Sequence, residues 1–339
     1  MNKEELIQTA TALMAGDKGL LAMDESLPTS NKRFAEAGIP QTEEYRRKYR
    51  QLIVTTPGLN ESISGAILFD ETIYQSTDDG TLFIDVLYKA GIIPGIKVDE
   101  GTVDMPGSPK EKITNGLEGL DIRLNNYYGL GARFAKWRAV ITIGDGLPTT
   151  ANIKANAEAL AKYARLCQED DIVPIVEPEV LMDGDHTIDR CYAVTEAAIK
   201  ELFIQLDAQG VFLPGLILKP NMVIAGRDSK TKNSTDEVAK ATVECLLASV
   251  PPEVGGVAFL SGGQSPQEAT RHLHEMHVLF GDKLPWPLTF SFARAIQQPA
   301  LDLWKGKDEN VVAAQEILAF RASMDSAARA GRYSVDIDI

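Results

Sequence analysis

The sequence predicts an α/β protein that folds as a single (β/α)8 TIM barrel. Short apolar runs recur eight times along the 339 residues, and most intervals between them contain one amphipathic helix. Strands that alternate with helices are joined by right-handed crossovers into a parallel sheet. A closed barrel is favoured over an open sheet because it brings the polar residues near the ends of seven runs to one mouth. These residues are Asp24, Asp70, Lys97, Glu177, Lys219, Ser261 and Ser291.

The expected elements follow from the periodicity of the apolar residues. Asn2 and Glu5 form a capping-box pattern ahead of apolar residues at helical spacing, which predicts an N-terminal helix. Helices between the runs bury one stripe each, as the spacing of Ile153, Ala157 and Leu160 indicates. The predicted strands cover residues 19–23, 65–69, 95–98, 138–143, 172–176, 215–218, 256–260 and 287–292.

The end of the chain is predicted to add one helix and a tail. Apolar residues at helical spacing cover residues 310–328, and residues 331–339 are expected to form a short C-terminal tail. The chain contains no internal repeat beyond the βα unit and no inter-domain linker. We therefore expect residues 1–330 to form one barrel domain.

The charge of the chain limits its partners. A net charge of −14 and a pI near 4.8 argue against nucleic acid and against an anionic membrane surface. The three cysteines, Cys167, Cys191 and Cys245, are widely spaced and suggest neither a disulfide framework nor a CxxC site. Neither a signal peptide nor an apolar run of about 18 residues is found. These observations predict a soluble, cytoplasmic protein with reduced thiols.

The most informative residue is Lys219, which ends the apolar run 215–218 and precedes Pro220 and Asn221. Burial can lower the pKa of a lysine by several units, which makes its amine a nucleophile toward a carbonyl near neutral pH. Lys219 is therefore a candidate for Schiff-base chemistry. The alternative is that a lysine at a strand end extends its ammonium group into solvent.

Other charged residues stand in comparable places and favour the catalytic interpretation. Lys97 and Lys136 also accompany apolar runs, and a second cation can hold a nucleophilic lysine neutral or bind an anionic substrate group. Asp24 follows the first run, while Glu177 and Glu179 follow the fifth. Carboxylates beside amines supply the proton transfers of carbinolamine dehydration and carbon–carbon cleavage. Taken singly, each acid is equally well explained as a helix cap or a surface group.

Two groups of residues are candidates for phosphate binding. Ser261, Gly262 and Gly263 open a helix after the seventh run, where backbone N–H groups can close on an oxyanion, although a plain turn is the alternative. Arg294, just past the eighth run, would add a bidentate partner, and Ser291 at the end of that run joins this group. On the opposite side of the mouth, Lys32 and Arg33 could hold a second phosphate or form a solvated helix face.

A histidine-rich zinc site is not expected. His272, His274 and His277 lie close in sequence, but on a helix the second and third point about 200° and about 140° away from the first. The three histidines are interpreted as a solvated helix face.

The motifs together resemble those of the class I fructose-bisphosphate aldolases, in order and at matching spacing from about residue 3 to residue 333. The matching segments are Met23-Asp24-Glu25-Ser26, Gly95-Ile96-Lys97-Val98-Asp99, Phe134-Ala135-Lys136-Trp137-Arg138, Pro174-Ile175-Val176-Glu177-Pro178-Glu179, Asp183-Gly184-Asp185-His186, Leu218-Lys219-Pro220-Asn221-Met222 and Phe259-Leu260-Ser261-Gly262-Gly263-Gln264-Ser265.

The resemblance implies a role for each catalytic candidate. Lys219 matches the lysine that forms the Schiff base with the ketose or with dihydroxyacetone phosphate. Glu177 matches the acid that helps to expel water from the carbinolamine, and Lys136 matches its cationic neighbour. Asp24 matches the carboxylate that takes the C4 hydroxyl proton, and Glu179 matches an acid close to this network.

The resemblance also assigns the phosphate sites. Ser261, Gly262 and Arg294 match the cradle of the ketone-end phosphate. The residues that match the side receiving the rest of the substrate are Lys32, Arg33 and Arg138, with Lys97 nearby. Neither a metal nor another cofactor is implied, because the iminium withdraws the electrons that a zinc ion would otherwise withdraw.

Three departures from the family pattern affect these assignments. The chain stops shortly after Tyr333, without the long tail whose final tyrosine assists proton exchange in many members, so reprotonation is expected to be slower or to use water. The loop after Asp24 contains residues 27–29, Leu-Pro-Thr, where small residues are expected. Ala293 stands where a glycine often precedes the arginine, so phosphate binding by its N–H group requires a negative φ at this residue.

We therefore predict a metal-independent aldolase that reversibly cleaves fructose 1,6-bisphosphate to dihydroxyacetone phosphate and glyceraldehyde 3-phosphate. One alternative keeps the mechanism but takes sedoheptulose 1,7-bisphosphate as a main substrate. Another is a catalytically idle barrel that acts as a binding scaffold, which predicts loss of Lys219, Glu177 or Asp24, although all three are present. The resemblance suggests a homo-oligomer such as a tetramer, with a dimer or monomer as alternatives.

Overall fold

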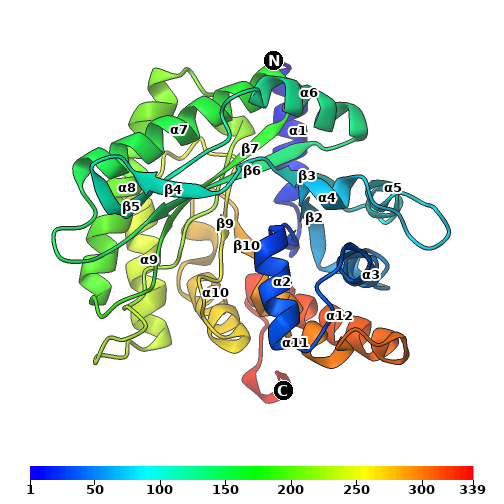
Figure 1. The fold of residues 1–339 in the computed structure, drawn as a ribbon. Helices are drawn as coiled ribbons and strands as arrows, with labels where there is room; N and C mark the ends of the chain where they lie inside the picture. The colour runs from blue at the N-terminus through cyan, green and yellow to red at the C-terminus, as the bar shows by residue number, and fades with distance from the viewer. Residues whose placement is uncertain (339) are drawn as a thin grey trace.

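Eight parallel strands form a closed barrel in the computed structural model, which describes residues 1–338 (Figure 1). Around the barrel the strands follow the order β1-β10-β9-β8-β7-β6-β3-β2. The predicted (β/α)8 barrel is thus confirmed. The barrel strands are β1 (Gly19–Ala22), β2 (Ile63–Leu68), β3 (Ile93–Lys97), β6 (Phe134–Ile141), β7 (Val173–Val180), β8 (Ile217–Leu218), β9 (Gly256–Phe259) and β10 (Leu288–Phe292).

Every predicted strand is present; six have bounds within two residues of those predicted, whereas β6 and β7 each differ by four residues at one end. Strand β6 begins four residues before the predicted residue 138, and β7 continues four residues past the predicted residue 176. In both cases charged side chains that point into the barrel interrupt the apolar run, namely Lys136 and Arg138 in β6 and Glu177 in β7. An apolar-run criterion stops where the inner face of a strand turns polar, so it missed the first four residues of β6, which include Lys136, and the last four of β7, which include Glu177.

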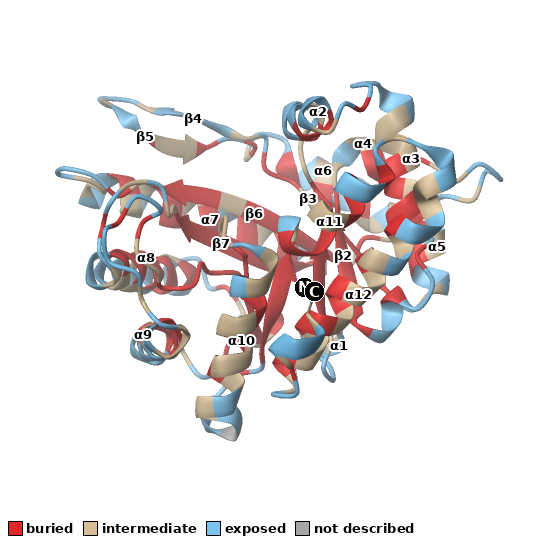
Figure 2. Ribbon diagram, turned by 90° about the horizontal axis from the view of Figure 1, so that it is seen from below, coloured by how far each residue is buried: buried red, intermediate tan, exposed pale blue. Residues whose placement is uncertain are grey.

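Within residues 1–338, twelve α-helices accompany the barrel strands, and exposed residues lie along their outer faces (Figure 2). Asn2 caps the first helix by accepting a hydrogen bond from the Glu5 N–H, as the capping-box pattern predicted. Across residues 1–338, none of the helices combines the length and the apolar character that crossing a membrane requires. The helices are α1 (Lys3–Leu13), α2 (Leu27–Glu36), α3 (Glu43–Val54), α4 (Asp70–Ile73), α5 (Phe83–Lys89), α6 (Leu120–Leu130), α7 (Thr150–Glu169), α8 (Ile188–Ala208), α9 (Thr235–Ser249), α10 (Pro266–Phe280), α11 (Arg294–Trp304) and α12 (Val311–Arg329).

Helix α1 packs against the N-terminal end of the barrel. Leu6, Leu13 and other apolar residues of α1 form one buried cluster with interior residues of the strands, including Phe134. Glycines make room for these large side chains: a Cβ atom added at Gly95 would lie 2.3 Å from the Phe134 ring, and one at Gly65 would lie 2.5 Å from Leu13. Apolar packing therefore fills the end of the barrel opposite the mouth.

An antiparallel hairpin that the sequence did not predict stands beside the mouth. It consists of β4 (Thr102–Met105) and β5 (Ser108–Thr114), and most of its residues are at least partly exposed (Figure 2). The exceptions are Glu111, which is 1% exposed, and Thr114, which is 7% exposed. The Glu111 carboxylate accepts hydrogen bonds from Ser108 Oγ at 2.8 Å and from the Thr149 N–H at 2.7 Å. This buried acid, together with the bonds from Asn152 and Asn156 to the Lys112 carbonyl, attaches the hairpin to α7.

The predicted C-terminal tail is ordered against the barrel as far as residue 338, while residue 339 lies outside the described residues. A short 3-10 turn covers Val335–Ile337. Asp338 forms a fully buried ion pair with Arg321 of α12, and it also accepts a hydrogen bond from Tyr333 Oη at 2.7 Å. This end of the chain is therefore held by buried polar contacts.

Candidate active site

The candidate site lies in a cavity of about 690 Å³ at the mouth of the barrel. Acidic and basic side chains from several loops and strands line it together, as expected where the C-terminal ends of barrel strands converge. The charged residues of the lining are Asp24, Glu25, Asp70, Lys97, Asp99, Glu100, Arg123, Lys136 and Arg138.

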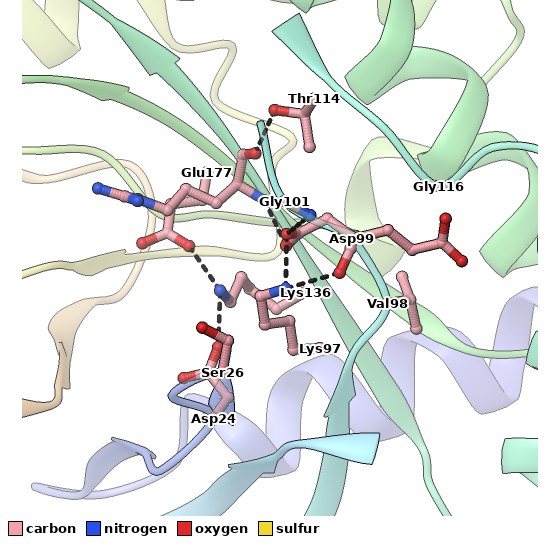
Figure 3. A network of polar contacts seen from close by, with 12 residues as sticks. Asp24, Ser26, Lys97, Val98, Asp99, Gly101, Thr114, Gly116, Lys136 and Glu177 are labelled. Atoms are coloured by element: carbon pink, nitrogen blue, oxygen red, sulfur yellow. Dashed lines mark hydrogen bonds and ion pairs between the residues drawn. The ribbon is translucent and has the colours of Figure 1, made fainter. Parts of the chain in front are cut away.

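A network of four buried charges forms the centre of the site. The Lys136 ammonium lies 2.7 Å from an Asp24 oxygen and 3.2 Å from a Glu177 oxygen (Figure 3). The other Glu177 oxygen lies 3.3 Å from Lys219 Nζ. Each of these four residues is less than 9% exposed. Glu177 therefore bridges the two lysines.

The alternation of residues along a strand explains why these side chains meet. In β6, Lys136 and Arg138 point to the inside of the barrel, whereas Trp137 between them packs outside, 5.5 Å from the Tyr163 ring. The pairing of β6 with β7 places Arg138 opposite Glu177. Lys219 continues β8, since its N–H donates to the Val176 carbonyl at 2.8 Å.

The loop after Lys219 is fixed by an asparagine. Asn221 is 5% exposed, and its side-chain oxygen accepts a hydrogen bond from the Val180 N–H at 3.0 Å. The amide nitrogen of Asn221 donates to Thr195 of α8 at 3.1 Å. The Lys-Pro-Asn motif thus links the end of β8 to the end of β7.

The buried charges stabilise one another electrostatically. Burial by itself would raise the pKa of Asp24. The ammonium groups of Lys136 and Lys219 together outweigh burial and lower this pKa to about 2. The pKa of Glu177 also lies below its usual value, because Lys136 and Lys219 outweigh its burial. The pKa of Lys136 is raised, because Asp24 and Glu177 outweigh the cost of burying its charge. Both carboxyl groups are ionised at neutral pH.

A second group of charges occupies the wall of the cavity. Lys97 Nζ lies 2.6 Å from an Asp99 carboxylate oxygen, and Arg138 pairs with Glu179. The pKa of Arg138 is raised, since Glu179 outweighs its burial. The Arg138 side chain is 40% exposed, whereas that of Lys97 is 12% exposed. These two cations reach the cavity from neighbouring strands.

The glycine loop opens α10, as the sequence predicted. Gly262 and Gly263 adopt φ values of 55° and 78°, which favour glycine, and Ser265 caps the helix. Arg294 lies beside this loop, with a guanidinium nitrogen 3.7 Å from where a Gly263 Cβ would be. Ala293 has a negative φ of −109°. This meets the requirement, predicted from the sequence, for phosphate binding by its N–H group. Ser291 is buried, and its hydroxyl has no partner among residues 1–338.

Lys32 and Arg33 lie on α2 but do not act as a pair. Lys32 is exposed. Arg33 is 8% exposed, pairs with Glu25, and donates to Gln298 at 3.1 Å. Glu25 also contacts Arg50 at 2.8 Å. The sequence did not identify Glu25 as a partner, since its two arginines are brought to it by separate helices.

The histidines of α10 do not form one cluster. His272 is hydrogen-bonded to Gln264 at 2.6 Å, while His274 packs 5.7 Å from the Tyr333 ring. The expected solvated face is wrong, because all three are partly buried, and burial lowers the pKa of His272 and His277 to about 4. Among residues 1–338 no group of three or more His, Cys, Asp or Glu side chains is placed to hold a metal.

Comparisons with known proteins agree with the fold and the motifs. A family model described as "Fructose-bisphosphate aldolase class-I" matches residues 5–338. The "Probable fructose-bisphosphate aldolase class 1" of Xanthomonas campestris is 53% identical over 334 residues, or 98% of this chain and 99% of that one. "Fructose-bisphosphate aldolase 4, cytosolic" of Arabidopsis thaliana is 49% identical over 99% of this chain and 85% of its own.

A solved structure extends the likeness to three dimensions. It is a complex of fructose-bisphosphate aldolase from Plasmodium falciparum with TRAP and a small-molecule inhibitor. The match has a TM-score of 0.96 and 47% identity, and it covers 98% of this chain and 95% of that one. The chain therefore belongs to the class I fructose-bisphosphate aldolases, a family of lyases.

Proposed function

We propose that this enzyme reversibly cleaves fructose 1,6-bisphosphate to dihydroxyacetone phosphate and glyceraldehyde 3-phosphate through a Schiff base on Lys219. The observation that carries the proposal is Glu177, which lies between Lys219 and Lys136 while Lys136 also contacts Asp24. An amine and two carboxylates within one buried network meet the needs of both imine formation and carbon–carbon cleavage.

Imine formation would use Lys219 and Glu177. The neutral amine attacks the C2 carbonyl, and a proton reaches the oxygen as the carbinolamine forms. Glu177, which is ionised in the free enzyme, first takes the proton that the Lys219 ammonium gives up, and it then delivers this proton to the departing hydroxyl group, so that water leaves and a protonated imine remains. The Lys136 ammonium lies 3.2 Å from Glu177. It stabilises the carboxylate form of Glu177 each time this group has given up its proton. Glu179, paired with Arg138, lies next to the same wall.

Cleavage would use Asp24. Its carboxylate accepts the C4 hydroxyl proton, the C4 oxygen forms the aldehyde, and the C3–C4 electron pair moves into the iminium to give an enamine. The lowered pKa of Asp24, at about 2, keeps this base ionised throughout the physiological range. The iminium is the electron acceptor, so the proposed steps need neither a metal nor another cofactor.

The two phosphates would bind on opposite sides of the mouth. For the ketone end we propose Ser261, the N–H groups of Gly262 and Gly263, Arg294 and Ser291. Glycine N–H groups at a helix start suit an oxyanion, and a guanidinium beside them adds a bidentate partner. For the aldehyde end we propose Lys97 and Arg138, with Lys32 and Arg33 at the rim.

Borohydride trapping tests the proposal. The protein is mixed with dihydroxyacetone phosphate in the presence of a chelator, reduced, and digested for peptide mass mapping. We expect one adduct on Lys219 and none in Lys219→Met. An adduct on another lysine, or wild-type cleavage by the variant, would disprove the assignment. Specificity constants for fructose 1,6-bisphosphate and sedoheptulose 1,7-bisphosphate decide the main substrate.

We also propose a cytoplasmic homo-oligomer, such as a tetramer. The Arabidopsis relatives named as cytosolic support the compartment. Large apolar side chains on the surface, such as Tyr88 at 78% and Ile122 at 73% exposure, are available for subunit contacts. Light scattering after size-exclusion chromatography measures the mass directly, and a single species at 36.9 kDa would contradict the proposed assembly.

A further inference from the structure

Asp99 holds together three parts of the cavity wall. It follows β3, and its side chain is 4% exposed. One carboxylate oxygen lies 2.6 Å from Lys97 Nζ and accepts the Gly101 N–H at 3.2 Å. The other accepts the backbone N–H of Arg138 at 3.2 Å (Figure 3). A single buried acid thus contacts β3, β6 and Gly101, the residue before the β4–β5 hairpin.

These contacts fix the ammonium group of Lys97. Lys97 Nζ also donates to the backbone carbonyl of Asp99 at 2.6 Å, and it lies 5.9 Å from the centre of the Phe69 ring. A lysine side chain has many rotamers, and holding it in one of them costs entropy. Because a carboxylate oxygen and the carbonyl oxygen of Asp99 both bind the ammonium group, the Lys97 side chain is ordered before a ligand binds.

The backbone of Arg138 is held from both sides. Its N–H donates to Asp99, and its carbonyl accepts a hydrogen bond from Thr114 Oγ1 of β5 at 2.8 Å. The segment of residues 99–114 thereby fixes the backbone position of Arg138 in β6. The guanidinium itself pairs with Glu179, so Asp99 does not compete for it.

We propose that Asp99 is a positioning residue for the aldehyde-end phosphate, because it sets the placement of Lys97 relative to Arg138. The inference rests on the proposed function, in which these two cations bind that phosphate. Asp99 carries a negative charge near a phosphate site, which by itself would weaken binding. Its oxygens are instead directed to Lys97 and to two backbone N–H groups, so the ordering of the cations outweighs the repulsion.

The experiment compares Asp99→Asn with the wild type on fructose 1,6-bisphosphate and on fructose 1-phosphate, which lacks the second phosphate. We expect the KM for the bisphosphate to rise about tenfold, the size of one charge-assisted contact. The kcat for the bisphosphate, and both constants for fructose 1-phosphate, should stay within about twofold, because the Schiff-base residues are not touched.

Two further variants separate positioning from a general loosening of the loop. Glu111→Gln weakens the hairpin's attachment to α7 without touching Lys97 or Arg138, so both substrates should behave as with the wild type. Thr114→Val removes only the hydrogen bond to the Arg138 carbonyl. It should raise the bisphosphate KM by about threefold, and it serves as the test if Asp99→Asn does not fold.

Equal losses on both substrates, an unchanged bisphosphate KM, or a lower one would each overturn the inference. A lower KM would mean that charge repulsion dominates. The wild-type assay comes first: if wild-type enzyme cleaves neither ketose, the proposed function fails. If it cleaves both but Asp99→Asn shows no selective effect, only the role of Asp99 is wrong.

Discussion

Lys136→Met isolates the electrostatics of the buried network. Lys136 is 4% exposed and lies within 3.2 Å of both Asp24 and Glu177. At an effective dielectric constant of 20, each contact corresponds to about 5 kcal/mol of attraction. The variant avoids the cost of burying an ammonium, but it leaves two buried carboxylates without the cation that contacts both of them. Breaking such a pair costs about 3–5 kcal/mol, and we expect this loss at pH 8.

The pH dependence of the loss identifies its cause. In the wild type the pKa of Asp24 is about 2, so its stabilising contribution is complete above the unfolded value of 3.8 and disappears only below it. Without Lys136, both carboxyl groups should have pKa values above those of the unfolded chain. The variant then gains stability relative to the wild type as pH falls, and the difference should shrink between pH 8 and pH 5.

The assay is urea unfolding followed by circular dichroism at both pH values and equal protein concentration. Lys154→Met is a matched control, because Lys154 is 59% exposed and lies 4.0 Å from Glu158 on the surface of α7. Its loss should stay below about 0.5 kcal/mol at either pH. A loss under about 1 kcal/mol for Lys136→Met at pH 8, or the same loss at both pH values, would refute the reasoning.

Three further variants test other parts of the structure. Asp24→Asn should slow cleavage about a thousandfold while borohydride still traps an adduct with dihydroxyacetone phosphate, and loss of both reactions would contradict a role in cleavage alone. Burial raises the pKa of Asp325 to about 7, against 3.8 normally, so wild-type stability falls as pH rises through this interval. Asp325→Asn should remove up to about 4 kcal/mol of that fall. If the free energies of unfolding of the variant and the wild type run parallel from pH 5 to 8, Asp325 is not its cause. Asp338→Asn leaves Arg321 buried without its charge partner and should lower the free energy of unfolding by about 3 kcal/mol; an unchanged denaturation midpoint would show that the pair contributes nothing.

Most of the fold could be predicted because the barrel strands bury nearly every side chain. Apolar runs located all eight strands, and they failed where a strand carries charges on its inner face, as at Lys136 in β6. The β4–β5 hairpin has no apolar run, and polar contacts with α7 attach it, among them the bond from Thr149 to the buried Glu111, 38 residues away. Periodicity cannot detect such a pairing.

The site was predictable to a similar extent. The convergence of strand ends in a barrel brings Asp24, Lys136, Glu177 and Lys219 together, whatever the loops do. The acids that hold the outer cations were missed: Asp99 beside Lys97, and Glu25 between Arg33 and Arg50. Their pairing depends on side-chain direction in loops and helices, which residue order does not determine.

The packing of α1 into the barrel has a consequence for how this sequence can change. A methyl group at Gly95 would lie 2.3 Å from the Phe134 ring, and one at Gly256 would lie 2.5 Å from the Met14 side chain. Neither glycine can accept a side chain unless its bulky neighbour becomes smaller at the same time. Evolution should therefore exchange these residues in pairs, with small and large swapping places across the barrel floor. In an alignment of relatives, positions 95 and 134 are expected to covary although 38 residues separate them.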